Sequence, residues 1–167
     1  MRVAHFHEKA TNFMSFARYF VRHPGARVVE VPTDAAGISL TVARISEQTV
    51  ILIKDGRKAV GAVSLRQLRN KALREKFGAV YEPHAYVVKN YRGRGLVEGV
   101  YRWLLSEGLV FRSAPCQSFA SNGLWRKLSL DFHCGLVHVQ EARLIGPGDT
   151  VGNRRVRLIL SQAPLPD

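Results

Sequence analysis

Hydrophobic positions in the first part of the chain follow a helical repeat and then a series of strand-like runs. Over residues 8–22, Phe13, Phe16, Ala17 and Phe20 are spaced i, i+3, i+4 and i+7, which predicts an amphipathic helix that ends before Pro24-Gly25. The following segments are rich in β-branched residues and predict strands over residues 26–31, 38–45, 49–53 and 59–64. Asp55-Gly56 marks a hairpin turn between the last two of these strands.

The second part of the chain mixes helical and strand patterns. Over residues 65–77 the apolar residues Leu65, Leu68, Ala72 and Leu73 recur at helical spacing, and Arg and Lys occupy most positions between them. This pattern predicts a basic helix with one apolar face. A strand over residues 80–89, a turn at Gly93 and Gly95 and a helix over residues 96–108 follow in that order. The remaining pattern predicts a strand over residues 116–120, a helix over 122–130, and strands over 136–145 and 154–160, with a turn starting at 146–149.

Runs of consecutive strands with single helices between them indicate a fold class of α/β type with an α+β mixed sheet, and not a strictly alternating doubly wound fold. With 167 residues, 46% of them hydrophobic, and no internal repeat or linker, the chain is predicted to form a single globular domain over residues 1–167. Residues 1–30 form its N-terminal helix and lead-in strand, and residues 38–160 form its core.

Charge and cysteine content narrow the range of partners. The chain has 25 Lys+Arg and 13 Asp+Glu, a formal net charge of +12, which favours an acidic partner over a cationic one. Cys116 and Cys134 lack the close pairing of a zinc site, and neither His5 and His7 nor His133 belongs to a complete ligand set, so we expect reduced thiols and no metal. Without a signal-peptide pattern or an apolar run of about 20 residues, we expect a cytoplasmic protein that does not enter a membrane.

The segment over residues 90–97 lies between a predicted strand and a predicted helix and carries the clearest chemical signal. Free backbone N–H groups and the helix dipole favour an anion at such a turn, and Arg92 and Arg94 add positive charge. The pattern therefore predicts a site for a phosphate or pyrophosphate, with a tight turn carrying two solvated arginines as the alternative. It is neither a Walker loop nor a six-residue dinucleotide fingerprint.

The same turn resembles a family motif. Residues 92–97 occupy the places of the acyl-coenzyme A motif Arg/Gln-x-x-Gly-x-Gly/Ala of the GNAT superfamily of N-acetyltransferases, with Val97 in the last place. The resemblance extends over roughly residues 38–160, including Ala85-Tyr86-Val87-Val88 and the segment 121–128. It implies a GNAT-like acyl-CoA N-acyltransferase fold with splayed central strands, here with an extra N-terminal helix. Divergent, stand-alone chains of this kind resemble members encoded by bacteriophages.

The resemblance also implies roles for individual residues. The backbone of Tyr86, Val87 and Val88 would bind the pantetheine arm of acetyl-CoA, and Asn122 is a weaker candidate for contacting it. The pyrophosphate would be held by Arg92, Gly93, Arg94, Gly95, Leu96 and Val97. The chain departs from the family at Val97, where a Gly or Ala is usual, and at Trp125, where a Tyr is usual. An indole is not an ordinary proton donor to a leaving thiolate.

Candidates for acid and base chemistry are few. Glu82 is the candidate general base, because alternate strand positions would place it on one face with His84 and Tyr86; a surface carboxylate is the alternative interpretation. Ser121 is a candidate proton donor to the thiolate. Tyr101 and Cys116 are also considered, with helix packing and a small buried thiol as their respective alternatives.

Three functions remain open on this basis. The first is an acetyl-CoA-dependent N-acetyltransferase that moves acetyl directly to an amine of an unidentified acceptor, on a protein or a small molecule. The second is a catalytically weak or inactive GNAT-like module that binds a protein partner, such as a host enzyme. The third is nucleic-acid binding by the basic segment 65–77 and by Arg154-Arg155-x-Arg157. A monomer and a homodimer are both compatible with the sequence.

Overall fold

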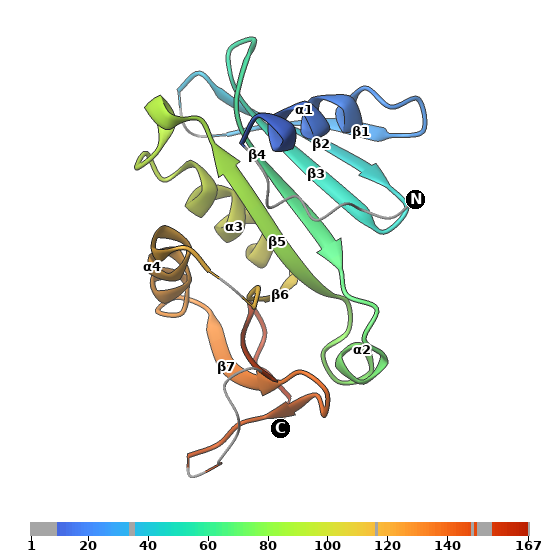
Figure 1. Ribbon diagram of the computed structural model, residues 1–167, viewed down its shortest axis with the longest axis vertical. Helices are drawn as coiled ribbons and strands as arrows, with labels where there is room; N and C mark the ends of the chain where they lie inside the picture. The colour runs from blue at the N-terminus through green and yellow to red at the C-terminus, as the bar shows by residue number, and fades with distance from the viewer. Residues whose placement is uncertain (1–9, 34–35, 116, 148, 150–154, 167) are drawn as a thin grey trace. The chain divides into compact units, whose positions relative to one another are not determined.

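The computed structural model describes residues 10–33, 36–115, 117–147, 149 and 155–166, and its elements form a mixed α/β fold (Figure 1). The fold class predicted from the sequence is thereby confirmed. The chain forms two compact units, the first of Met1–Arg66 with His84–Val97 and the second of Gln67–Pro83 with Glu98–Asp167. Strand β5 (Val80–Val87) and helix α3 (Leu96–Ser106) each contribute residues to both units.

The sheet of the first unit contains four consecutive antiparallel strands followed by the end of β5. The bounds are β1 (Arg27–Pro32), β2 (Ile38–Ile45), β3 (Gln48–Asp55) and β4 (Lys58–Gln67), in the order β1-β2-β3-β4-β5. All four strands were predicted: β2 has the predicted bounds, β1 is shifted by one residue, and β3 and β4 are longer than predicted. Gly56 has a φ of 55°, which confirms the predicted hairpin turn because this conformation favours glycine.

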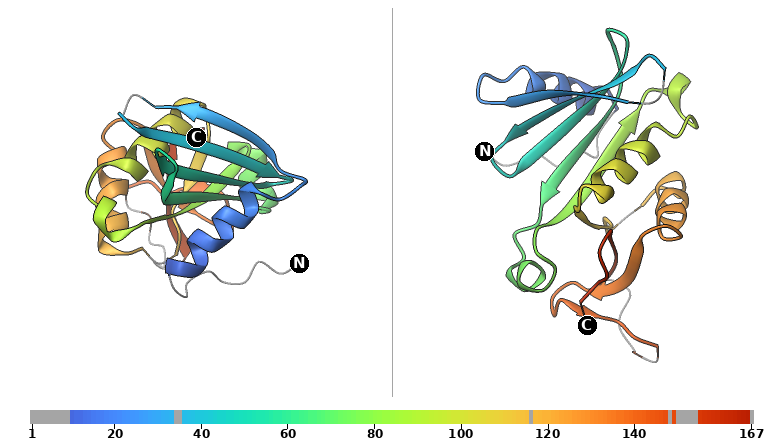
Figure 2. Two further views of the ribbon diagram at one scale, coloured as in Figure 1. Left: turned by 90° about the horizontal axis from the view of Figure 1, so that it is seen from above. Right: turned by 180° about the vertical axis from the view of Figure 1, so that it is seen from behind.

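Helix α1 (Ala10–Val21) lies across one face of this sheet (Figures 1 and 2). Phe13 and Phe20 are buried, Phe16 is partly buried, and together they pack with apolar residues of β2, β3 and β4 such as Ala43 and Val50. The predicted packing role of these phenylalanines is confirmed. Full burial of one such side chain contributes about 1.5–3 kcal/mol, so this short helix is stabilised mainly by its contact with the sheet.

The second unit is built around short strands of mixed direction. It contains the beginning of β5 together with β6 (Val110–Arg112), β9 (Val156–Ser161), β7 (His133–His138) and β8 (Arg143–Leu144), in the order β5-β6-β9-β7-β8. Strands β5 and β6 run parallel and pair at Val80↔Val110 and Tyr81↔Phe111, whereas the other pairs are antiparallel. Strand β5 continues to Val87, beyond its last pair with β6 at Tyr81↔Phe111.

The predicted basic helix begins later than expected. Helix α2 spans Lys71–Phe77, and Asn70 caps it by accepting a hydrogen bond from the backbone N–H of Leu73. Leu65 and Arg66 instead belong to β4, where they pair with Thr49 and Gln48 of β3. Hydrogen bonds to a neighbouring strand therefore outweigh a helical spacing that was visible only locally.

Two further strand predictions were wrong. Phe119 and Ala120 start helix α4 (Phe119–Leu128), with Ser118 as its N-cap, whereas a strand was expected over 116–120; Cys116 lies outside the described residues. The expected strand over 136–145 is a hairpin, because β8 turns back to pair with β7 at Val137↔Leu144.

In the described part of the chain, no helix combines the length and the apolar character needed to cross a membrane.

Candidate functional site

The turn predicted to bind an anion has an unusual backbone geometry. Strand β5 ends at Val87, the 3-10 helix η1 (Lys89–Tyr91) follows, and α3 starts at Leu96. Gly93 and Gly95 have φ values of 76° and 73°, whereas Arg94 between them has no positive φ. Alternation of positive and negative φ is the backbone pattern of turns whose successive N–H groups face one side, as in known anion sites. A Cβ built on either glycine meets nothing within 4 Å, so the space beside the turn is open.

The backbone donors of this turn are available. In the part of the chain that the structure describes, the N–H groups of Gly93, Arg94 and Gly95 donate to no backbone carbonyl. The four residues from Arg92 to Gly95 are exposed. The first turn of α3 adds its own unpaired N–H groups and the positive end of the helix dipole. The predicted strand, glycine turn and helix are therefore present, with donors directed at solvent.

Both arginines of the turn are held by neighbouring groups. The Nε atom of Arg92 donates to the carbonyl of Val87 at 2.9 Å, and its guanidinium lies 5.6 Å from the ring centre of Tyr86. The guanidinium of Arg94 lies 4.7 Å from the ring centre of Tyr91. Because a guanidinium has five donors, both side chains retain N–H groups for an anion. Both side chains are exposed, as the alternative of a tight turn with two solvated arginines also requires.

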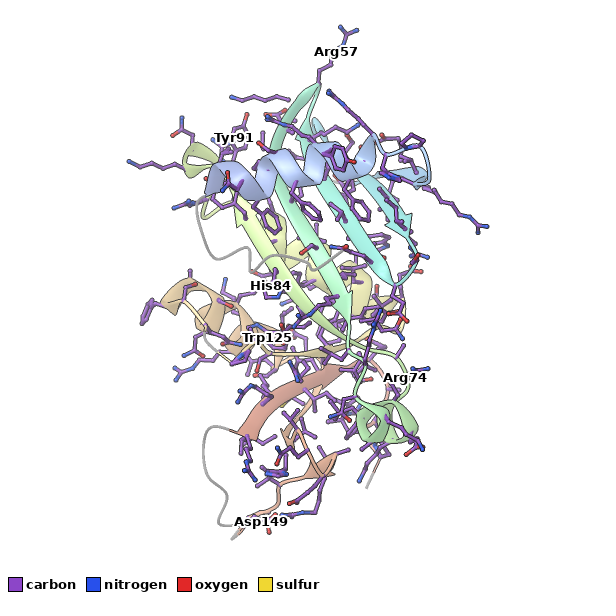
Figure 3. All side chains as sticks on the ribbon, turned by 45° about the vertical axis from the view of Figure 1, so that its right-hand side comes forward. Arg57, Arg74, His84, Tyr91, Trp125 and Asp149 are labelled. Atoms are coloured by element: carbon purple, nitrogen blue, oxygen red, sulfur yellow. The ribbon has the colours of Figure 1, made fainter. Side chains whose placement is uncertain are left out.

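Tyr91 ties the turn to the β3–β4 hairpin. Its hydroxyl donates to Oδ2 of Asp55 at 2.7 Å, and the Nζ atom of Lys58 lies 5.6 Å from its ring centre. The hydrogen bond to Asp55 raises the pKa of Tyr91 above its ordinary 10.0, and the charge of Arg94 opposes this shift in part. Figure 3 labels Tyr91, and also Arg57, which points away from the sheet at the hairpin tip. The contact between Tyr91 and Asp55 has no signature in the sequence, because no motif links the two residues.

The backbone of β5 is oriented by its contact with β4. The N–H of Val88 donates to the carbonyl of Val60 at 2.9 Å, and a Cβ built on Gly61 would lie 3.0 Å from the carbonyl oxygen of Tyr86. Tyr86 and Val88 therefore direct backbone groups toward β4. Because successive strand residues alternate, Val87 and Ala85 direct theirs to the opposite edge. Of the three predicted pantetheine contacts, this geometry favours Val87, and it adds Ala85, which the sequence analysis had not singled out.

Glu82, the candidate base, lies inside the second unit. Its side chain is buried and forms an ion pair and hydrogen bond with Nη2 of Arg112, which is also buried. The parallel register explains the contact, because Glu82 and Arg112 follow directly after the pair Tyr81↔Phe111. The alternative interpretation as a surface carboxylate is wrong. A carboxylate that neutralises a buried guanidinium has a structural task, whether or not it also accepts a proton.

The remaining predicted residues lie on α3 and α4. Tyr101 is buried and makes an edge-to-face contact with Phe111 at 5.4 Å, and burial raises the pKa of its hydroxyl, so the packing interpretation is confirmed. Ser121 donates its backbone N–H to Oγ of Ser118, and Asn122 is exposed, so their roles stay predictions. Trp125 is a buried residue of α4 (Figure 3).

Glu98 lies in the first turn of α3. Burial alone would raise the pKa of Glu98, but hydrogen bonds and charge from Arg102 and Lys127 outweigh it and hold this pKa below 4.5. Glu98 therefore remains ionised and paired with two cations.

Metal ligands do not assemble in the described ranges, where no group of three or more His, Cys, Asp or Glu side chains could hold an ion. Cys134 is a free, exposed thiol. His5 and His7 lie outside the described residues.

No protein-family model matches the sequence, and no curated protein matches it. Among solved structures, the chain is similar to the ribosomal alpha-N-protein acetyltransferase RimL, with 12% identity, a TM-score of 0.49, and coverage of 80% of this chain and 93% of that one. A putative acetyltransferase of the GNAT family from Bacteroides thetaiotaomicron has 11% identity and a TM-score of 0.43, over 92% of this chain and 82% of that one.

The self-immunity acetyltransferase MccE, solved with acetyl-CoA and AMP, has 17% identity and a TM-score of 0.39, over 68% of this chain and 59% of that one. The chain thus spans less than two thirds of MccE. At these identities the likenesses concern the fold alone, and their TM-scores below 0.5 add no argument about activity. The functional case depends on the residues of the turn.

Proposed function

We propose that the chain is an acetyl-CoA-dependent N-acetyltransferase that transfers acetyl directly to an amine. The turn from Arg92 to Gly95, with its open glycines and unpaired N–H groups at the start of α3, carries this proposal. A diphosphate fits this chemistry because it offers several acceptor oxygens and negative charge to a concave set of donors. Arg94, whose guanidinium lies 4.7 Å from the ring centre of Tyr91, supplies a guanidinium for the diphosphate.

The edge of β5 opposite to β4 suits the arm of the donor. Val87 and Ala85 turn backbone groups to this edge, where an amide-containing pantetheine chain pairs as a further strand would. The carbonyl of Val87 already accepts a hydrogen bond from Arg92, so its N–H is the group left for the arm.

Transfer needs a neutral amine and a held thioester. The amine nitrogen attacks the carbonyl carbon, the carbon–sulfur bond breaks, and the proton lost by the nitrogen ends on the released thiolate of coenzyme A. Holding both reactants in place supplies effective molarities of about 10⁵–10⁸ M, which is the main contribution we assign to this chain. Ser121 remains the predicted donor to the thiolate, and Glu82 the predicted base, although its carboxylate is engaged by Arg112.

Calorimetric titration of acetyl-CoA and coenzyme A at moderate salt tests the proposal. We compare the wild-type protein with Arg94→Glu and with Arg57→Glu, which makes the same charge change at the exposed hairpin tip of the same unit. Wild-type protein should bind with one-site saturation, and Arg94→Glu should weaken binding about tenfold or more, whereas Arg57→Glu should change it less than about twofold.

Equal weakening by the two variants would show that only overall charge matters. Absence of wild-type binding would overturn the proposal and favour the protein-binding module instead. Release of free coenzyme A thiol on addition of amine acceptors then separates an active enzyme from a binding protein that holds the cofactor without turnover.

A further inference from the structure

The second unit contains a cavity whose lining is dominated by arginine. Its volume is about 200 Å³, and its wall is formed by Arg112, Pro115, Val139, Gln140, Arg155 and Arg157. Three of these six side chains are guanidinium groups, and none is a carboxylate. The sequence predicts Arg155 and Arg157 as possible contacts to nucleic acid, and in the structure both residues line this cavity.

Strand register explains why the three arginines converge. Strands β6 and β9 are antiparallel and pair at Arg112↔Ile159, so these two residues share a face. Arg157 precedes Ile159 at the alternate position and therefore lies on the same face. The carbonyl of Arg155 accepts the N–H of Val139 at 2.9 Å, which fixes the approach to β9 against the end of β7. Paired strands thus hold the cavity wall in place.

The positive charge around the cavity is only partly neutralised. Glu82 pairs with Arg112, but no described carboxylate lies within ion-pair distance of Arg155 or Arg157. Arg157 donates from Nη1 to the carbonyl of its neighbour Val156. The Nε atoms of Arg112 and Arg157 are buried and have no hydrogen-bond partner among the described residues. Three cations against one anion leave an excess of two positive charges.

We propose that this cavity binds a phosphate dianion, as inorganic phosphate or as the phosphate monoester of a small molecule. Guanidinium groups pair with phosphate oxygens in a planar, two-pronged geometry, and a dianion neutralises the excess of two charges. The cavity is smaller than the roughly 300–1,000 Å³ typical of drug-sized ligand pockets, so it accepts the phosphate group with a small attached fragment. A phosphodiester has a single charge and leaves one guanidinium without compensation.

This site is independent of the acetyl-CoA proposal. Its residues belong to the second unit, whereas the glycine turn belongs to the first. Coenzyme A itself has a phosphate monoester that the cavity could bind. Titration of coenzyme A into Arg155→Gln therefore tests whether the cavity contributes to coenzyme A binding. Wild-type affinity for coenzyme A in this variant shows that the cavity is a separate site.

The test is calorimetric titration of inorganic phosphate and of methyl phosphate, at an ionic strength held constant with sodium chloride. The variants are Arg155→Gln, at an exposed position, and Arg157→Met, which keeps the stem but removes the charge. Arg143→Gln is the matched control, because Arg143 is an exposed arginine of the same unit that is already paired with Asp149. Arg155→Gln keeps the test valid if the half-buried Arg157→Met fails to fold.

We expect saturable binding to the wild-type protein, a loss of about tenfold or more in each cavity variant, and less than about twofold in the control. Equal weakening in all three variants, or no wild-type binding, would overturn the proposal. Acetate that binds as tightly as phosphate would contradict the dianion assignment. Binding of a single-stranded oligonucleotide that depends on Arg155 and Arg157, without phosphate binding, would instead identify a nucleic-acid contact.

Discussion

Two groups of arginine residues in this protein are maintained by different physical means. Arg92 and Arg94 are exposed at the glycine turn of the first unit, supported by aromatic rings and one carbonyl. Arg112 is buried in the second unit, and its charge is balanced by Glu82. An exposed charge is well solvated, so its position depends on the shape of the backbone beneath it. A buried charge has lost that solvation, so it depends on a counter-ion and on exact strand register.

The difference separates two kinds of sensitivity to mutation. At the turn, substitutions should alter ligand affinity more than folding, because little apolar surface or charge is buried there. In the cavity wall, loss of a counter-charge should alter folding first, because an unpaired buried guanidinium has no water to stabilise it.

The largest expected effect is that of Glu82→Gln. Arg112 then remains buried without its counter-charge, and the free energy of unfolding should fall by about 3–5 kcal/mol. Urea unfolding of the variant and of Glu107→Gln, an exposed acid in the same unit, measures the difference. The control should change stability by no more than about 0.5 kcal/mol. The double variant Glu82→Leu with Arg112→Met should recover much of the lost stability. Similar stabilities for Glu82→Gln and Glu107→Gln would show that Arg112 does not depend on a counter-ion.

An intermediate effect is expected from Gly95→Ala compared with Gly56→Ala. The φ values are 73° and 55°, and a Cβ meets nothing within 4 Å at either position, so strain alone should cost each variant about 1–2 kcal/mol of stability. Only Gly95→Ala should also weaken acetyl-CoA binding, because an alanine disfavours the positive φ that shapes the proposed diphosphate turn. Unfolding curves and calorimetry on both variants check this, and an equal change in affinity would remove the assigned role of the turn.

The smallest effect concerns Tyr91→Phe. The folded-state pKa of Tyr91 is raised above 10.0, chiefly by its hydrogen bond to Asp55, so the contribution of this contact to stability is present below pH 10 and is lost as pH rises through the folded pKa. The tyrosinate absorbance of the wild-type protein minus that of Tyr91→Phe should titrate with a midpoint above 10.0. A midpoint at or below that value would mean that the turn is not tied to Asp55. Acetyl-CoA binding should weaken less than in Gly95→Ala.

The features that were predicted correctly are determined by residues that lie close together in the sequence. The strands β1 to β4, the hairpin at Gly56 and the helix after Gly95 all follow from hydrophobic alternation, helical spacing or a residue that tolerates positive φ. The turn at Gly93 and Gly95 is confirmed in the same way, because glycine tolerates a positive φ, whereas its binding of an anion stays a prediction. Each of these features needs only a short stretch of chain to form.

The features that only the tertiary structure decided are contacts between distant residues. Leu65 pairs with Thr49, so a segment of helical spacing becomes strand, and the segment after Leu136 folds back as a hairpin. The partners Glu82 with Arg112, and Tyr91 with Asp55, meet because strands pair in a particular register. Hydrogen bonding between strands and the desolvation of paired charges act through space, and no local pattern of side chains records them.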